Sequence, residues 1–264
     1  MKRLNITNIQ DLKNKRPIVC LTSYTASFAK TIESYIDILL VGDSLGTVIY
    51  GMKNTQNVTL ELMKKHGRAV IKSTQRPFTI IDMPFQSFRN KKDAYNNAKQ
   101  LLAFTSCQSI KIEAGQRDIN IIEYLAKKKI NVISHIGVRP QSFRDFSKIK
   151  ILGRNSYERK RLINLALKLQ DAGSSLIFLE CIVEDVAKEI SSIIDIPTIG
   201  IGSGVNCDGQ VLVINDLLGF NSDFSRPKFV KTYLNMPSQI KKAVKKFSQE
   251  VRMKKFPSKK YSYK

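Results

Sequence analysis

Short apolar runs alternate with helix-length amphipathic segments along this chain, and this alternation restricts the fold more than any other feature. The runs predict strands at residues 17–24, 37–43, 78–84, 109–115, 131–137, 175–181, 197–203 and 210–216. The intervening segments predict helices at residues 26–35, 59–73, 91–105, 118–128, 157–171 and 184–194. Most strands are apolar on both faces, as in parallel sheets covered by helices. The pattern therefore predicts an α/β fold, a (β/α)₈ barrel of the TIM type.

A doubly wound open sheet is the main alternative. That fold more often carries G-x-G-x-x-G after its first strand, and LTSYTAS (21–27) does not match this motif. The only glycine-rich stretch of this kind, GIGSG (200–204), lies near the end of the chain. We interpret it as a tight turn at a crowded barrel mouth in preference to a phosphate-binding loop.

We expect one barrel domain over residues 1–264, with a short N-terminal extension at about 1–16. After the barrel, a helix is predicted from Pro237 to about Arg252. Its apolar residues recur at spacings of four, three and four, which places Ile240, Val244, Phe247 and Val251 on one face. We expect this C-terminal amphipathic helix to pack against the barrel or a neighbouring subunit. A basic tail follows at about residues 253–264.

The charge of the chain raises the question of nucleic-acid binding. There are 44 Lys and Arg residues against 22 Asp and Glu, a formal net charge of +22, and the pI is about 9.9. The basic residues are scattered over predicted helix surfaces and are not interleaved with aromatics in one patch. We therefore interpret the charge as a compositional background and do not expect a nucleic-acid partner.

Cysteine and histidine usage limits the chemistry. Four cysteines lie far apart (Cys20, Cys107, Cys181 and Cys207), without a C-x-x-C pair, which favours a reducing cytoplasm over a disulfide framework or zinc site. Only two histidines, His66 and His135, are present, so we expect any metal to be held by oxygen ligands. We expect neither a signal peptide nor a membrane span, because no apolar run is long enough.

Charged and polar residues stand where the predicted strands end. They are Asp43 and Ser44, then Asp82, then Lys111 and Glu113, then His135, and finally Glu180. In a barrel these strand ends meet at one mouth, where active sites lie. Each residue alone has an ordinary explanation, such as a helix cap for either aspartate, a Lys111–Glu113 pair, or a core histidine. Glu180 is harder to explain in this way, because it follows a mostly apolar run.

Together these residues indicate a site for a hard cation and a 2-oxo acid. Three carboxylates (Asp43, Asp82 and Glu113) favour Mg²⁺, which keeps waters that a substrate replaces. Lys111 and Ser44 would hold a substrate carboxylate. Glu180, in an apolar strand, is expected to have a pKa raised by desolvation, as a general base requires. A metal that polarises a 2-oxo acid opposite a carboxylate base is suited to forming an enolate.

These residues lie in stretches that resemble one known family. In order, VGDSLG, DMPF, IKIEAG, SHIGVRPQS, LEC and IPTIGIGSGVNCDGQVLV resemble the ketopantoate (3-methyl-2-oxobutanoate) hydroxymethyltransferases, which catalyse the first committed step of pantothenate synthesis. The resemblance extends from about Leu21 to residue 229. It implies a (β/α)₈ barrel, often a homodecamer, which transfers a hydroxymethyl group from 5,10-methylenetetrahydrofolate to 3-methyl-2-oxobutanoate and yields 2-dehydropantoate.

The resemblance also implies a role for each residue. Asp43, Asp82 and Glu113 would bind one Mg²⁺ per subunit. Substrate binding is implied for five residues: Asp43, Ser44, Asp82, Lys111 and His135. Glu180 would be the catalytic proton acceptor at C3 of the substrate. The residues that contact the folate are not implied.

Five residues at four sites depart from the family pattern. Thr25 stands where the family usually has an acidic residue, and Val183 where it usually has proline. Asn215 replaces a usual histidine, and Lys260-Tyr261 a usual Glu-His. None belongs to the expected metal site or is the expected base, so we expect activity to be retained.

Two other functions remain open. One is a Mg²⁺-dependent 2-oxo-acid lyase of the isocitrate-lyase-like or phosphoenolpyruvate-mutase-like type, which places similar chemistry in a comparable barrel mouth. The other is a polyanion-binding protein derived from an enzyme, for which only the charge of +22 argues.

Overall fold

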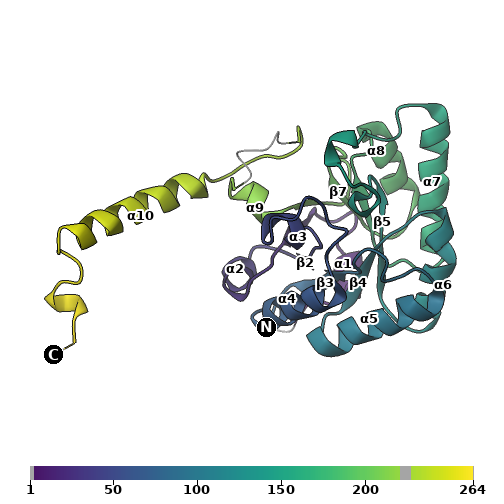
Figure 1. The fold of residues 1–264 in the computed structure, drawn as a ribbon. Coiled ribbons are helices and arrows are strands. Elements are labelled where there is room, and N and C mark those ends of the chain that lie inside the picture. The colour runs from purple at the N-terminus through teal and green to yellow at the C-terminus, as the bar shows by residue number, and fades with distance from the viewer. Residues whose placement is uncertain (1–2, 221–226, 264) are drawn as a thin grey trace. The chain divides into compact units, whose positions relative to one another are not determined.

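The computed structural model describes residues 3–220 and 227–263 (Figure 1). The chain divides into two compact units, residues 1–213 and 214–264. Among the described residues, no helix combines the length and the apolar character needed to cross a bilayer.

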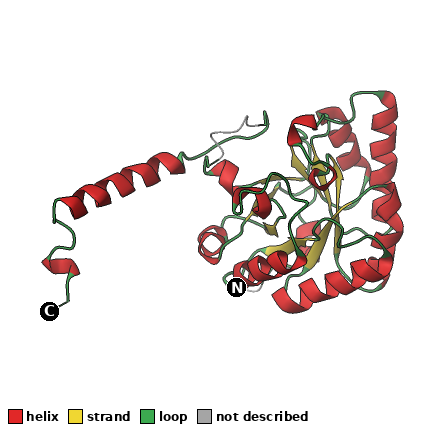
Figure 2. Ribbon diagram, viewed as in Figure 1, coloured by secondary structure: helices red, strands yellow, loops and turns green. Residues whose placement is uncertain are grey.

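The first unit is a closed barrel of parallel strands in chain order, β1 to β8, with β8 pairing with β1. The strands are β1 (Ile18–Thr22), β2 (Ile38–Val41), β3 (Phe78–Asp82), β4 (Ser109–Glu113), β5 (Val132–Gly137), β6 (Ile177–Glu180), β7 (Thr198–Ile201) and β8 (Gly209–Leu212). Figure 2 shows helices around the strands in this unit. The predicted (β/α)₈ barrel is confirmed.

The helices of the first unit are α1 (Ile6–Gln10), α2 (Ala26–Ile32), α3 (Leu45–Val48), α4 (Leu60–Lys72), α5 (Lys91–Thr105), α6 (Ile119–Lys127), α7 (Ser156–Asp171) and α8 (Glu184–Ile193). Side-chain caps start several of them: Thr59 accepts from Leu62 N, Asn90 from Asp93 N and Asn155 from Glu158 N. The structure confirms the six predicted helices.

Short helices at other positions were not predicted. The predicted strand at 210–216 ends at Leu212, and Ile214–Leu217 form the four-residue helix α9. α1 and α3 are similarly short, with five and four residues. Segments this short show too little helical periodicity to be recognised in a sequence.

The N-terminal extension is part of the barrel core. Ile9 of α1 is fully buried and belongs to one apolar cluster with strand residues such as Ile18 and Phe78. Lys13 pairs with Asp208 at 2.7 Å, and Leu4 N donates to Arg76 O at 2.9 Å. α1 therefore packs against the core at the end where the strands begin, and the opposite end carries the polar strand-end residues.

The second unit contains α9 and α10 (Met236–Arg252). α10 starts after Asn235, whose side chain accepts from Ser238 N, and it has Pro at its first turn. The predicted stripe of Ile240, Val244, Phe247 and Val251 is exposed, each side chain by 44–57%. The predicted C-terminal amphipathic helix is thus present.

Candidate active site

The predicted site residues come from β2–β6, at the ends where these strands finish. Strand register brings them side by side: Asp82 is opposite Lys111, Glu113 is opposite His135, and Gly137 is opposite Glu180. Asp43, Asp82, Lys111, Glu113 and His135 are all at most 6% exposed. Burial of so many ionisable groups at one end of a barrel lowers the stability of the protein unless the groups pair with one another or bind a ligand.

Asp43 and Asp82 lie next to each other. The backbone N–H of Asp43 donates to Asp82 Oδ2 at 3.0 Å, and the two carboxylates lie two residues past β2 and at the end of β3. Burial, and then the charge of Asp82, raise the pKa of Asp43 to about 7. A nearby positive charge would allow Asp43 to ionise at neutral pH.

Lys111 is the buried cation of this cluster. Its Nζ lies 2.7 Å from Asp82 Oδ1 in a contact without good hydrogen-bond angles, so we regard it as an ion pair. Burial alone would lower the pKa of Lys111, but the neighbouring carboxylates, led by Asp82, raise it above its ordinary value. The lysine therefore stays charged, and its ion-pair partner is Asp82 and not Glu113.

Glu113 is held by a residue that we did not predict. The backbone N–H of Gln141 donates to its Oε2 at 3.0 Å and to its Oε1 at 3.3 Å. Burial and then the charge of Asp43 raise the pKa of Glu113 well above its usual value. Three buried carboxylates face one buried lysine, which leaves room for the two positive charges of a divalent cation.

Glu180 and His135 form a second pair at the mouth. His135 Nε2 lies 3.2 Å from Glu180 Oε2, and His135 Nδ1 lies 4.0 Å from Glu113 Oε1. Neither ring nitrogen has good hydrogen-bond geometry to a described residue, so these are close electrostatic approaches. The Glu180 side chain is 19% exposed. Glu180 is therefore the most accessible of the four carboxylates at the mouth, although its place after an apolar run predicted desolvation.

Ser44 has an unpredicted partner as well. The Tyr24 hydroxyl lies 2.8 Å from Ser44 Oγ, and Tyr24 is buried just after β1. Tyr24 belongs to LTSYTAS, a stretch in which we examined the predicted strand, the absent glycine motif and Thr25 but gave Tyr24 no role. A tyrosine at the end of a strand, next to the mouth, was the available signal.

The arrangement of the carboxylates at the mouth limits which metal ions could bind there. Within residues 3–220 and 227–263, no group of three or more His, Cys, Asp or Glu side chains is arranged to hold a metal ion. A cation that needs only one or two protein carboxylates and keeps its waters, such as Mg²⁺, is compatible with this arrangement. Zinc, which takes several His or Cys ligands, does not fit it.

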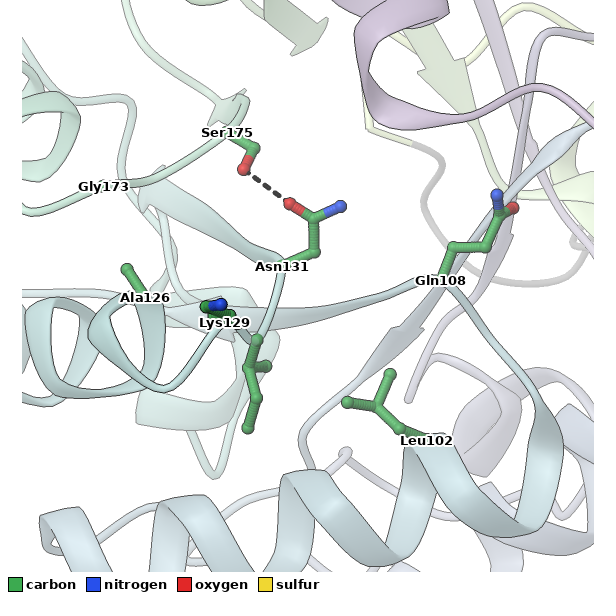
Figure 3. A pocket seen from close by; sticks show the side chains of 8 residues that line it. Leu102, Gln108, Ala126, Lys129, Asn131, Gly173 and Ser175 are labelled. Atoms are coloured by element: carbon green, nitrogen blue, oxygen red, sulfur yellow. Dashed lines mark hydrogen bonds between the residues drawn. The ribbon is translucent and has the colours of Figure 1, made fainter.

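A hollow of about 450 Å³ lies at the other end of the barrel (Figure 3). Its lining includes Gln108, Asn131 and Ser175, which precede β4, β5 and β6, and Ser175 Oγ donates to Asn131 Oδ1 at 2.8 Å. None of the clustered ionisable residues lines it. We therefore place the active site at the mouth and not in this hollow.

The raised pKa of Asp43 predicts a pH-dependent stability. Its native pKa of about 7 exceeds its unfolded value of 3.8, so the native state binds the extra proton and stability falls as pH rises from about 4 to 7. One such group contributes a slope of at most about 1.4 kcal/mol per pH unit. Urea unfolding with EDTA present, compared between wild type and Asp43→Asn, would measure it. Identical slopes in the two proteins would contradict the assignment.

Gly137 supports the position of Glu180. Its φ is +96°, and a Cβ there would lie 2.2 Å from the carbonyl oxygen of Glu180. Gly137→Ala is therefore expected to cost about 2–4 kcal/mol of unfolding free energy through strain and overlap, and to lower activity by displacing Glu180. Gly51→Ala is the matched control, because its φ is +63° with no atom within 4 Å of the added Cβ. Equal losses in urea unfolding would show that the overlap is unimportant.

One departure from the family pattern has a local explanation. Val183 has φ −57°, which a proline also adopts, but its N–H donates to Leu152 O at 2.9 Å. Valine thus supplies a hydrogen bond that proline lacks. Thr25 stands at the N-cap of α2 without a side-chain cap bond. Nothing in the structure explains the change at Asn215 or at Lys260-Tyr261.

Comparison with known sequences gives a consistent result. A family model described as ketopantoate hydroxymethyltransferase matches residues 3–259. The chain is 43% identical to the 3-methyl-2-oxobutanoate hydroxymethyltransferase of Pelagibacter ubique (strain HTCC1062) over 258 residues, which cover 98% of each protein. It is 41% identical to the protein of the same name from Campylobacter concisus (strain 13826) over 263 residues, which cover 100% of this chain and 97% of that protein.

Solved structures share the fold. Phosphonopyruvate hydrolase in complex with oxalate and Mg²⁺ superposes with a TM-score of 0.60 at 10% identity, over 94% of this chain and 99% of that one. 2,3-Dimethylmalate lyase, a member of the PEP mutase/isocitrate lyase superfamily, gives a TM-score of 0.58 at 11% identity, over 92% and 98%. At such identities the likeness shows the barrel alone.

Proposed function

The chain belongs to the ketopantoate hydroxymethyltransferase family, a family of transferases, and from this premise we propose that it makes 2-dehydropantoate. It would transfer the one-carbon unit of 5,10-methylenetetrahydrofolate to C3 of 3-methyl-2-oxobutanoate. The observation that carries the proposal is the cluster at the mouth: buried carboxylates with one lysine, next to the more accessible Glu180.

The proposed cofactor is one Mg²⁺ per subunit. Asp43, Asp82 and Glu113 would hold it, and Mg²⁺ commonly needs only one or two protein carboxylates because it keeps several waters. When bound, it would polarise the carbonyl of the 2-oxo acid and stabilise negative charge on that oxygen. Phosphonopyruvate hydrolase, which shares the barrel fold, has been solved in complex with oxalate and Mg²⁺, and this is in keeping with the proposed metal.

Substrate binding falls to the residues around the two aspartates. Lys111 would hold the carboxylate of the 2-oxo acid as a fixed positive charge. Ser44, kept in place by the Tyr24 hydroxyl at 2.8 Å, would donate a hydrogen bond to the same group. Asp82, which contacts both Lys111 and the backbone of Asp43, would touch cation and substrate alike.

Glu180 would take the proton from C3. Its partial exposure at the end of β6 lets a substrate approach it, and His135 at 3.2 Å would steady its carboxylate. The C3–H bond breaks, its electron pair enters the C2–C3 enolate, and a new C–C bond forms between C3 and the one-carbon unit. The two C–N bonds of that unit break, a water supplies the hydroxyl oxygen, and tetrahydrofolate leaves with one proton from C3 and one from the water. His135 contacts Glu180 and Glu113 and so supports the substrate site from one side.

Product formation tests this reaction and separates it from the lyase alternative. With ¹³C-labelled methylene donor, NMR should detect labelled 2-dehydropantoate only when enzyme, 2-oxo acid, donor and Mg²⁺ are all present. EDTA should abolish the signal, and excess Mg²⁺ should restore it. Cleavage of a hydroxylated or substituted diacid without the folate donor, and no labelled product, would favour the lyase instead.

The compartment and assembly remain proposals too. All four cysteines are free and buried, which supports a reducing cytoplasm. The exposed apolar stripe of α10 supports a homo-oligomer, for which the family suggests a decamer. Light scattering of the full chain would measure the assembly. A monomer at micromolar concentration would refute this part of the proposal.

A further inference from the structure

Gln141 is a buried polar residue to which nothing so far assigns a role. It lies in a short 3₁₀ turn, Pro140–Ser142, after β5, and is only 3% exposed. A buried glutamine is retained at a cost unless its amide is hydrogen-bonded, and the Nε2 amide group of Gln141 donates two hydrogen bonds.

Gln141 contacts three strand ends at once. Its Nε2 donates to Asp43 Oδ2 at 2.8 Å and to the carbonyl oxygen of Met83 at 3.0 Å. Its backbone N–H donates to Glu113. Because a carboxylate and a carbonyl are both acceptors, the NH₂ side of the amide must face them, which determines the orientation of the side chain.

These hydrogen bonds fix the orientation of the Asp43 and Glu113 carboxylates without adding a charge to the site. Nε2 donates to Oδ2 of Asp43 and thereby fixes the direction in which this carboxylate points. The backbone N–H restrains Glu113 in the same way. A lysine at this position would satisfy the same acceptors but would repel a cation, whereas the neutral amide does not.

We propose that Gln141 is a positioning residue that sets the orientation of Asp43 and Glu113 for a divalent cation. This inference takes one element from the proposed function, namely that these carboxylates bind Mg²⁺. It does not depend on the proposed reaction. Partners of this kind, which orient a ligand without touching the metal, are commonly worth about 10- to 100-fold in metal affinity.

Isothermal titration with Mg²⁺ alone tests the proposal without using the reaction. Gln141→Met keeps the volume and the backbone N–H to Glu113 but removes the amide donors, and it should bind Mg²⁺ about 10- to 100-fold more weakly. Gln56→Met is the matched control. Gln56 Nε2 donates to the backbone oxygen of Gln141 at 2.9 Å and contacts neither carboxylate, so its affinity should stay within about threefold of wild type.

A kinetic measurement distinguishes positioning from general structural support. In Gln141→Met the Mg²⁺ concentration for half-maximal rate should rise, and kcat should recover at saturating Mg²⁺. A loss of kcat that excess Mg²⁺ does not restore, or wild-type Mg²⁺ affinity in the titration, would overturn the proposal. If Gln141→Met does not fold, Gln141→Asn, one methylene too short to reach Asp43, should show the same weakening. Failure of both variants to fold would assign Gln141 to the scaffold and also overturn it.

Weak Mg²⁺ binding by the wild type itself would count against the proposed metal site and not specifically against Gln141. Normal Mg²⁺ binding by the wild type, without formation of 2-dehydropantoate, would refute the proposed reaction and leave the positioning role testable by titration.

Discussion

Glu180→Gln is expected to lower kcat by about 10²- to 10⁴-fold, the usual contribution of a general base. Glutamine has the shape of glutamate but cannot accept the C3 proton. Since the side chain is only partly buried, the substitution leaves no buried charge unpaired, and folding should be preserved. Steady-state kinetics with saturating donor would measure kcat, and titration of the 2-oxo acid with Mg²⁺ would show affinity within about threefold of wild type.

A nearby carboxylate serves as the control for this substitution. Glu184 begins α8, four residues after Glu180, and accepts a hydrogen bond from Asn206 at 3.1 Å. Glu184→Gln should leave kcat almost unchanged. If Glu180→Gln kept more than a tenth of wild-type kcat, another group would have to be the base.

Lys111→Met is expected to have the second large effect, on stability as well as binding. Breaking a buried ion pair usually costs about 3–5 kcal/mol, because the remaining charge is left uncompensated. Here Asp82 would be left beside Asp43 and Glu113 without their shared cation. The affinity for the 2-oxo acid should fall by about 10- to 100-fold, since a hydrogen bond to a charged group is worth about 1.5–3 kcal/mol.

The stability loss in Lys111→Met should itself depend on pH. Protonation relieves the repulsion among the carboxylates, so the loss measured by urea unfolding should be smaller at pH 5 than at pH 8. Lys13→Met is the matched control, because Lys13 pairs with Asp208 at 2.7 Å at the opposite end of the barrel. It should destabilise the protein without changing 2-oxo-acid affinity. A Lys111→Met protein with normal affinity would exclude Lys111 from the substrate site.

The fold could be predicted because its signal is local. A strand that is buried on both faces, such as Phe78–Asp82, is apolar along most of its length, and a covering helix such as α4 repeats its apolar residues at helical spacing. The polar ends of such strands stand out for the same reason. Asp43, Asp82 and Glu113 were therefore identifiable from the sequence, and the structure brings them to one end of the barrel.

The parts that were not predicted depend on contacts between distant residues. Gln141 and Asp43 are hydrogen-bonded although they lie 98 positions apart in the chain, and no local sequence pattern predicts such a hydrogen bond. We considered Glu113 as a partner of Lys111 because the two share a face of β4. The ion-pair partner is instead Asp82, which lies opposite Lys111 on the neighbouring strand β3. The burial of Ile9 in α1 likewise depends on strand residues far away in the chain, such as Phe78 and Ile133.

The most direct test of the account is exchange of the C3 proton. 3-Methyl-2-oxobutanoate in D₂O, with enzyme and Mg²⁺ but without folate, should incorporate deuterium at C3, because Glu180 and the carboxylate site together suffice to form the enolate. With wild type, the C3 proton signal in the proton NMR spectrum should decay as deuterium replaces it. With Glu180→Gln, the rate of this exchange should be at least about 10²-fold lower. Equal exchange by both proteins, or product formation by a wild type that exchanges no C3 proton in single-turnover experiments, would contradict the account.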